Sequence, residues 1–440
     1  MRATTHEPPT SPPTKYIPPN VAAKIPLPRR MIAPLMILAG QGLQSAVNFL
    51  IGVLMARFAS VTGLGEYSLG ITVLFLTASL TETLIATPFT YVVLRQRSLR
   101  ARNIAFGTAL VATFALASLS GAIFAVIILF VPSLASLLPA LPAALVMMLM
   151  REMIRRRHYA LGEPGRALQS DLITMSLQLV VVGALIAAGR FSAASAFAAS
   201  AFACLVAICV GLTGLRPNTA ISLRLLMPYC RRYIRYGHWL ALGGTCQIIA
   251  LQSFPWFLYV TSDARATGAF IACLAISNLP NPFLVGMTNF ARPAMMRTFT
   301  EDGWPALLRQ TMVLELAFVL PVVVFALAAI SVDSQLLVLI YGADLAGATG
   351  TLAWTVLALV AVSVAAPLQL LMLAVHRPRA ILYLHLGELA AAYLIGLPLV
   401  ISLGLPGAGI GYFATALAGL MVLAVVFAVG WRRGQMAGST

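Results

Sequence analysis

Apolar stretches long enough to cross a membrane follow one another along nearly the whole chain after residue 30. A membrane-spanning helix needs about 20 mostly apolar residues. On this pattern the sequence predicts twelve spans, at residues 32–56, 67–93, 104–132, 134–150, 170–189, 192–212, 236–261, 266–291, 306–330, 346–374, 379–402 and 406–430. Residues 335–342 are too few to cross, and we expect them to form an interfacial or re-entrant cap.

The composition supports this interpretation. The 440 residues are 60% hydrophobic and 10% charged, whereas soluble domains are about 45–50% apolar and about 25% charged. We therefore expect an all-α integral membrane protein. The chain carries no Walker loop, and the short loops between spans leave no room for a soluble catalytic domain, so we expect neither an ATPase nor an enzyme.

The net charge of +16 is distributed in a way that indicates membrane topology rather than nucleic-acid binding. With twelve spans, all Lys and Arg residues except Arg57, Arg190 and Arg265 fall on the same side as the N-terminus. Lys and Arg accumulate on the cytoplasmic side of membrane proteins. The sequence therefore predicts that both termini are cytoplasmic, with anionic membrane lipids as secondary partners and no nucleic acid.

The spans divide into two halves. We expect a disordered, Pro-rich cytoplasmic tail at 1–30, a six-helix bundle at 31–212, a basic cytoplasmic linker at 213–235, a second six-helix bundle at 236–431 and a short tail at 432–440. A Pro-Phe pair and glutamines occur in both halves, at offsets that do not match well. Two parallel bundles around a central cavity are typical of transporters that work by alternating access.

Amide side chains lie inside several spans. Gln41, Gln44 and Asn48 share one helical face, and lipid cannot satisfy their hydrogen bonds. They either bond across a helix–helix interface or line a hydrated cavity, and three amides in register favour the cavity. Further candidates for the same cavity are Gln178, Gln247, Asn278, Asn281 and the carboxyl of Glu82. Amides both donate and accept hydrogen bonds, which suits sugar hydroxyls.

Ionisable groups within spans are costly and are often functional. His385 and Glu388 are three residues apart and can pair on one helical face. Together with Glu82 they are candidates for ion coupling, and a purely structural pair is the alternative. No spacing of the five cysteines suggests a disulfide, a metal site or a cofactor.

Three arginines stand at the ends of spans. Arg57, Arg235 and Arg292 either anchor their helices by extending toward the interface or bind a pyrophosphate, which suits a guanidinium group.

Residues 37–58 (ILAGQGLQSAVNFLIGVLMARF) and 63–93 resemble the opening of polysaccharide flippases of the multidrug/oligosaccharidyl-lipid/polysaccharide exporter superfamily. The segment LIYGADLAGATGTLAWTVLAL resembles the glycine-marked entry to the tenth helix of that family. The resemblance extends over most of residues 32–430.

The resemblance implies a multi-pass protein of the bacterial inner membrane that moves a prenyl-pyrophosphate-linked oligosaccharide to the outer leaflet for surface polysaccharide biosynthesis. It implies a lipid-linked glycan as substrate, and glycan polymerase and export proteins as partners. The alternative is a cation-coupled multidrug or small-solute antiporter, although the first span lacks the Asp that many of these carry. A lipid II flippase is disfavoured because the sequence predicts no arginine in the middle of a span.

Overall fold

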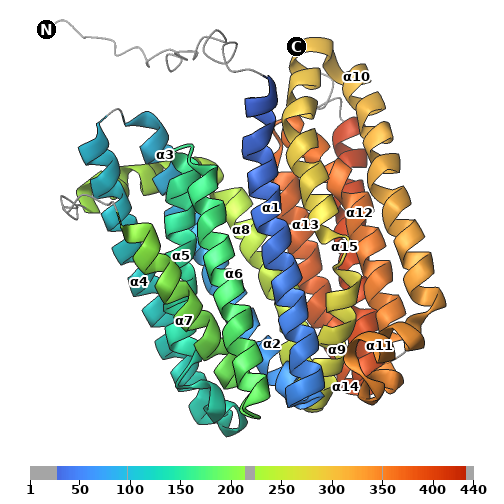
Figure 1. The fold of residues 1–440 in the computed structure, drawn as a ribbon. Helices are drawn as coiled ribbons and strands as arrows, with labels where there is room; N and C mark the ends of the chain where they lie inside the picture. Colours follow the sequence, from blue (N-terminus) through green and yellow to red (C-terminus); the bar gives the residue numbers. More distant parts are fainter. Residues whose placement is uncertain (1–26, 97, 214–222, 349, 433–440) are drawn as a thin grey trace, which may run out of the picture.

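The structure is a computed structural model that describes residues 27–96, 98–213, 223–348 and 350–432. These residues form helices and turns and contain no β-strand. Nine of their helices are long and apolar enough to cross a membrane. The chain is therefore an all-helical, multi-pass membrane protein, as its hydropathy predicts (Figure 1).

The first half of the chain forms the N-lobe, residues 27–212. Its elements are α1 (Leu27–Leu54), η2 (Met55–Ala59), α2 (Val61–Thr81), η3 (Glu82–Ala86), α3 (Thr87–Arg95), α4 (Leu99–Phe130), η4 (Pro132–Leu137), α5 (Leu141–Ala160), α6 (Pro164–Ala187) and α7 (Ala193–Leu212). Two short π-helical turns, η2 and η3, continue α1 and α2 without a break.

The second half forms the C-lobe, residues 223–432. Its elements are α8 (Leu223–Thr261), α9 (Ala264–Ser277), α10 (Asn281–Ser331), α11 (Asp333–Tyr341), η5 (Ala343–Ala348), α12 (Thr351–Ala374), α13 (Pro378–Ala391), η6 (Ala392–Gly396), α14 (Leu397–Leu403) and α15 (Leu405–Arg432). α10 contains a sharp bend at Gly303, whose φ of 77° suits only glycine without strain. The bend separates two membrane crossings, so each lobe supplies six.

The fourth crossing differs from the prediction of 134–150. A 3-10 helix, Pro132–Leu137, precedes it. α5 begins at Leu141 with Pro142 in its first turn, where a backbone N–H has no partner within the helix and its absence in proline costs nothing. The helix then continues to Ala160, through the basic run of residues 151–157, which the sequence analysis placed on the cytoplasmic side. Arginines of this run have acidic partners, described below.

Other boundaries refine the predicted segments. The predicted cap at 335–342 is the short helix α11, and α8 begins at Leu223, so the second part of the predicted linker is helical. Most of the predicted N-terminal tail, residues 214–222 and the tail beyond residue 432 lie outside the described residues.

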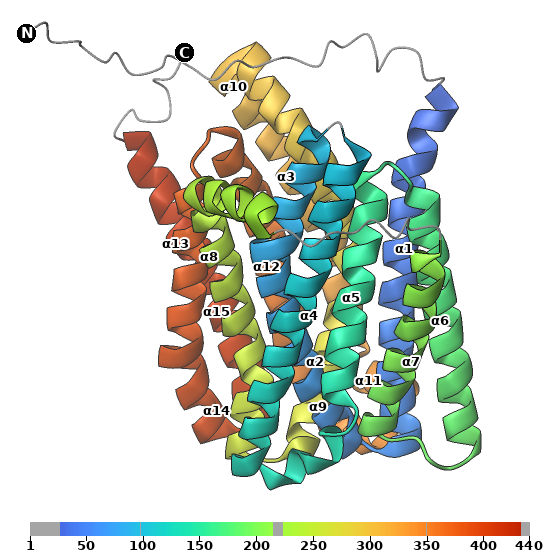
Figure 2. The same cartoon turned by 90° about the vertical axis from the view of Figure 1, so that its left-hand side faces the viewer.

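α1 begins and α15 ends at the same end of the molecule, which we name the terminal end; the opposite end is the far end (Figure 2). At the far end, one continuous hydrophobic core includes Ile51 and Leu64 of the N-lobe together with Ile276 and Leu337 of the C-lobe. Toward the terminal end each lobe has a separate hydrophobic core, which includes Phe89 in the N-lobe and Leu371 in the C-lobe. The lobes are thus joined most firmly at the far end.

Candidate functional site

Six charged side chains form a connected group in the half of the N-lobe nearer the terminal end. We name it the N-lobe ion network; its members are Glu82, Arg151, Glu152, Arg155, Arg156 and Asp171. α5 supplies four of them, because residues three or four apart in a helix lie on one face. With three cations and three carboxylates, the network has no formal net charge.

The inner part of the network is fully enclosed. Asp171 on α6 has no exposed surface and accepts a hydrogen bond from Arg151, whose side chain is 5% exposed. A second cation, Arg155, places Nη1 3.7 Å from the other oxygen of Asp171. Buried charges persist only when they are paired, so these ion pairs explain why the arginines of α5 are stable inside the lobe.

The outer part of the network is accessible. Arg156 Nη2 lies 2.7 Å from Oε2 of Glu82, and the two side chains are 38% and 41% exposed. Arg156 Nε also donates to Glu152, and Thr87 donates to Oε1 of Glu82. Glu82 begins the π-helical turn η3, which lies against α8 of the C-lobe. π-helical turns often occur at functional sites, and this one places the accessible ion pair where the lobes meet.

The structure brings one predicted cavity amide to the network. Gln44 on α1 accepts a hydrogen bond of 3.1 Å from Arg155 Nη1. Gln41 is partly buried and Asn48 is exposed, and within the described part of the chain neither bonds to another protein group. The three-amide face of α1 therefore meets the cations of α5 through its middle member.

The other predicted cavity residues lie elsewhere. Gln178 is 4% exposed and donates to Ser200 Oγ at 2.6 Å, which matches the helix–helix alternative. Gln247 is partly buried on α8. Asn278 and Asn281 are exposed and bond to each other at the break between α9 and α10, where Asn281 Nδ2 donates to Asn278 Oδ1 at 3.2 Å.

A second polar site lies in the C-lobe. His385 Nδ1 is 2.8 Å from Oε2 of Glu388, and both side chains are buried on α13. Two glycines make room for the pair: Gly243 of α8 packs beside His385 and Gly419 of α15 beside Glu388. Among the described residues, no group of three or more His, Cys, Asp or Glu side chains is placed to hold a metal ion.

The three predicted pyrophosphate ligands have different environments. Arg292 is exposed on α10, and the side chain of Arg235 lies outside the described residues. Arg57 is at the far end, where Nε donates to the Ile340 carbonyl at 2.7 Å and Nη2 donates to the Leu339 carbonyl. In this conformation the guanidinium group of Arg57 therefore binds backbone carbonyls and is not free to bind a phosphate.

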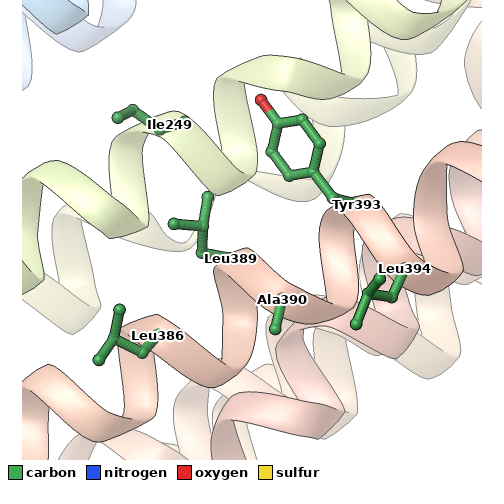
Figure 3. A pocket seen from close by; sticks show the side chains of 6 residues that line it. All are labelled: Ile249, Leu386, Leu389, Ala390, Tyr393 and Leu394. Atoms are coloured by element: carbon green, nitrogen blue, oxygen red, sulfur yellow. The ribbon is translucent and has the colours of Figure 1, made fainter.

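An apolar groove of about 540 Å³ runs along the C-lobe between α8 and α13 (Figure 3). It is lined by Ile249, Leu386, Leu389, Ala390, Tyr393 and Leu394. Its only polar feature in Figure 3 is the hydroxyl of Tyr393, which pairs with Ser253 Oγ at 2.9 Å. The lining of the groove is therefore apolar, and the Tyr393 hydroxyl on its wall is paired with Ser253.

The sequence analysis missed the four charged residues that α5 contributes. Placing the basic run REMIRRR outside the membrane hid the spacing of Arg151 and Arg155, which are four residues apart and so share a face. Asp171, inside the next span, was the available signal, because a buried carboxylate demands a cation nearby.

The architecture matches solved transporter structures, although no protein-family model and no curated protein matches the chain. The chain is similar to a multidrug resistance MATE family transporter of the MOP superfamily in an inward-facing conformation, with a TM-score of 0.72 and 14% identity over 89% of this chain and 94% of that one. An outward-facing MATE transporter gives a TM-score of 0.65 with 13% identity over 92% and 95% of the two chains.

A MOP superfamily transporter from Pyrococcus furiosus, described as having a binding pocket of reverse polarity, gives a TM-score of 0.64 with 14% identity over 92% of this chain and 95% of that one. At these identities the likeness concerns the fold. The chain has the fold of MOP superfamily transporters, with twelve membrane crossings in two bundles, as the resemblance implied.

Proposed function

We propose that this protein is a transporter that moves a lipid-linked oligosaccharide carrying a pyrophosphate from the inner to the outer leaflet of the membrane by alternating access. The fold supports transport, because its structural relatives are transporters seen in inward-facing and outward-facing forms. The accessible edge of the N-lobe ion network supports an anionic substrate, and that edge is the observation on which the proposal depends.

The network as a whole has no formal net charge, and the accessible guanidinium group of Arg156 is the part of it that would bind an anion. Every carboxylate in it already has an arginine partner, so it offers no free negative charge. A phosphate could replace Glu82 at Arg156, because both are oxygen acceptors for the same guanidinium group. The cost is small, since the Arg156–Glu82 pair is partly exposed, and exposed pairs contribute about 0–1 kcal/mol.

The amides beside the network suit the glycan. Gln44 joins Arg155 through its oxygen, which leaves its amide nitrogen as a donor. Gln41 and Asn48 continue the same face of α1 and make no protein hydrogen bond among the described residues. A hydroxyl-rich headgroup placed next to Arg156 can use these groups in place of water.

A cation-coupled antiporter is the second candidate, and the His385–Glu388 pair favours it. An imidazole and a carboxylate 2.8 Å apart are buried together in a membrane-spanning helix, and ionisable groups in such positions often serve ion coupling. The same pair could drive substrate movement in a flippase, so its presence alone does not distinguish the two functions. Identifying the transported substrate distinguishes them.

The test uses a strain that lacks the gene. Lipid-linked oligosaccharides are extracted and surface glycan is measured after complementation with the wild type, with Arg156→Gln and with Arg166→Gln. Arg166 is the matched control: it is 63% exposed, lies at the start of α6 and is not part of the network. All variants are compared at equal amounts in the membrane.

For a flippase, lipid-linked oligosaccharide accumulates without the gene, and the wild type and Arg166→Gln restore surface glycan. Arg156→Gln restores at least tenfold less. If surface glycan is normal without the gene and the strain is instead sensitive to a toxic cationic solute, the flippase proposal is wrong and the antiporter takes its place. If Arg156→Gln behaves as the wild type does, the network is not the substrate site.

A further inference from the structure

The two lobes cross at the far end through glycines. α2 and α9 both begin there, and Gly65 faces Ala264 while Gly268 faces Val61. A β-carbon added to either glycine would overlap the carbonyl oxygen of the facing residue. Only glycine allows two helix backbones to approach this closely, so the crossing is a seat on which one lobe rests against the other.

The two helices enter this seat in the same way. Ser60 caps α2 by accepting from the Gly63 amide, and Asp263 caps α9 by accepting from the Ala266 amide. The same number of residues separates Ser60 from Asp263 and Gly65 from Gly268. The crossing therefore joins equivalent positions of the two lobes, as expected where the pseudo-two-fold axis that relates two parallel repeats passes between them.

Arg57 reaches across the lobe boundary beside the seat. It ends the first crossing of the N-lobe, and its guanidinium group donates to the carbonyls of Leu339 and Ile340. These carbonyls are in the last turn of α11 in the C-lobe, where a helix leaves its carbonyls without internal partners and favours a cation. Phe49 and Tyr341 pack edge to face next to it, with centroids 6.4 Å apart.

A third contact lies deeper. Trp256 of α8 donates from Nε1 to Oγ1 of Thr72 on α2 at 2.7 Å, and Thr72 is buried. The continuous core described above surrounds the seat and joins both lobes. The far end is thus closed by apolar packing and neutral acceptors, and Arg57 is the charged group among these contacts.

We propose that Arg57 is a latch that holds the far-end gate shut, and that the Gly65–Gly268 crossing is the seat of that gate. Opening toward the far side requires the guanidinium group to leave both carbonyls of α11 and the two backbones to separate. The inference concerns the conformational cycle and does not depend on which substrate is carried.

The experiment measures the gate directly in the purified full-length protein. After replacement of the five native cysteines, spin labels are attached at Arg190→Cys in the N-lobe and Ser402→Cys in the C-lobe, both exposed at the far end. Double electron–electron resonance gives the distribution of distances between the labels in lipid nanodiscs. No substrate is added, so failure of the flippase proposal would leave this result unaffected.

Arg57→Ala should raise the share of the longer, open distance at least threefold over the labelled wild type. Arg265→Ala is the matched control, because it removes an exposed arginine from the same end without breaking a contact between the lobes. It should leave the distribution unchanged. A folded Arg57→Ala protein with the wild-type distribution would overturn the latch, as would an equal shift in Arg265→Ala.

A second variant tests the seat. Gly268→Val places a branched side chain where even a β-carbon overlaps the Val61 carbonyl, so the closed population should be lost and the open distance should dominate. Retention of the closed distance in this variant would overturn the role of the crossing. Since Arg57→Ala adds no atoms to the seat, it remains informative if Gly268→Val does not fold.

Discussion

Replacing Asp171 by asparagine tests the interior of the N-lobe ion network. Asp171 has no exposed surface and neutralises Arg151, which is 5% exposed, and Arg155, which lies 3.7 Å from its second oxygen. Asparagine keeps the shape of the side chain and removes the charge. It therefore leaves two buried guanidinium groups of α5 with one fewer carboxylate to compensate them.

The expected loss is large for a single substitution. Breaking a buried ion pair by removing one partner costs about 3–5 kcal/mol, because the remaining charge is left uncompensated in the interior. Glu152 still pairs with Arg155 at 2.8 Å, which places the loss at the lower end, about 3 kcal/mol. Arg151 has no such second partner among the described ion pairs and accounts for most of the effect.

Equilibrium unfolding in mixed detergent micelles, titrated with sodium dodecyl sulfate, measures the free energy of unfolding. Asp302→Asn is the control, since Asp302 is exposed beside the bend in α10 and surface substitutions change stability by about 0.5 kcal/mol or less. Equal unfolding free energies for Asp171→Asn and Asp302→Asn would refute the argument. Replacing Arg151 and Asp171 together by Met and Leu should recover part of the loss, because apolar pairs often substitute for buried ion pairs.

Three further predictions follow from individual contacts. Gly40→Ala should lower the unfolding free energy in the same assay by about 1–3 kcal/mol, because its β-carbon would lie 2.5 Å from Oδ2 of Asp171; an unchanged value would refute this close approach. Gln178→Leu should cost about 0.6 kcal/mol, the usual value of one hydrogen bond between membrane helices, and should leave complementation of the deletion strain intact, whereas lost complementation would place Gln178 in the cavity. Glu388→Gln keeps the bulk of its buried pair and removes the ionisable group, so transport by proteoliposomes should no longer respond to an imposed proton gradient; a persistent response would exclude Glu388 from coupling.

Hydropathy was sufficient to predict the architecture, because a bilayer restricts a spanning chain to helices of nearly fixed length. The same restriction explains why the ion pairs of α5 were not predicted. Arginines are costly in lipid, so the basic run of α5 was placed outside the membrane. In the structure the partner for Arg151 is Asp171, on the next helix, and no local pattern reveals which buried cation a distant carboxylate accepts.

Two further features depend on tertiary contact. The π-helical turns at Met55, Glu82 and Ala392 have no signature in the hydrophobic pattern. The closeness of Gly65 and Gly268 arises from two helices that the sequence separates widely. The amide face of α1 was found because its members are near neighbours in one helix, and only the structure joins Gln44 to Arg155.

The π-helical turn η3 has a consequence for which length changes the chain can tolerate. A π turn holds one residue more than an α-helical turn of the same height. Deleting one residue between Thr83 and Ala86 would therefore leave an α-helical turn of the same height, and the residues after it would keep their orientation relative to α2. Phe89 would stay against Phe106, its partner on α4 at 6.0 Å. The same deletion in a regular stretch of α2 would instead rotate everything after it by about 100°, so homologous chains should lose a residue at this turn more readily than elsewhere in the helix.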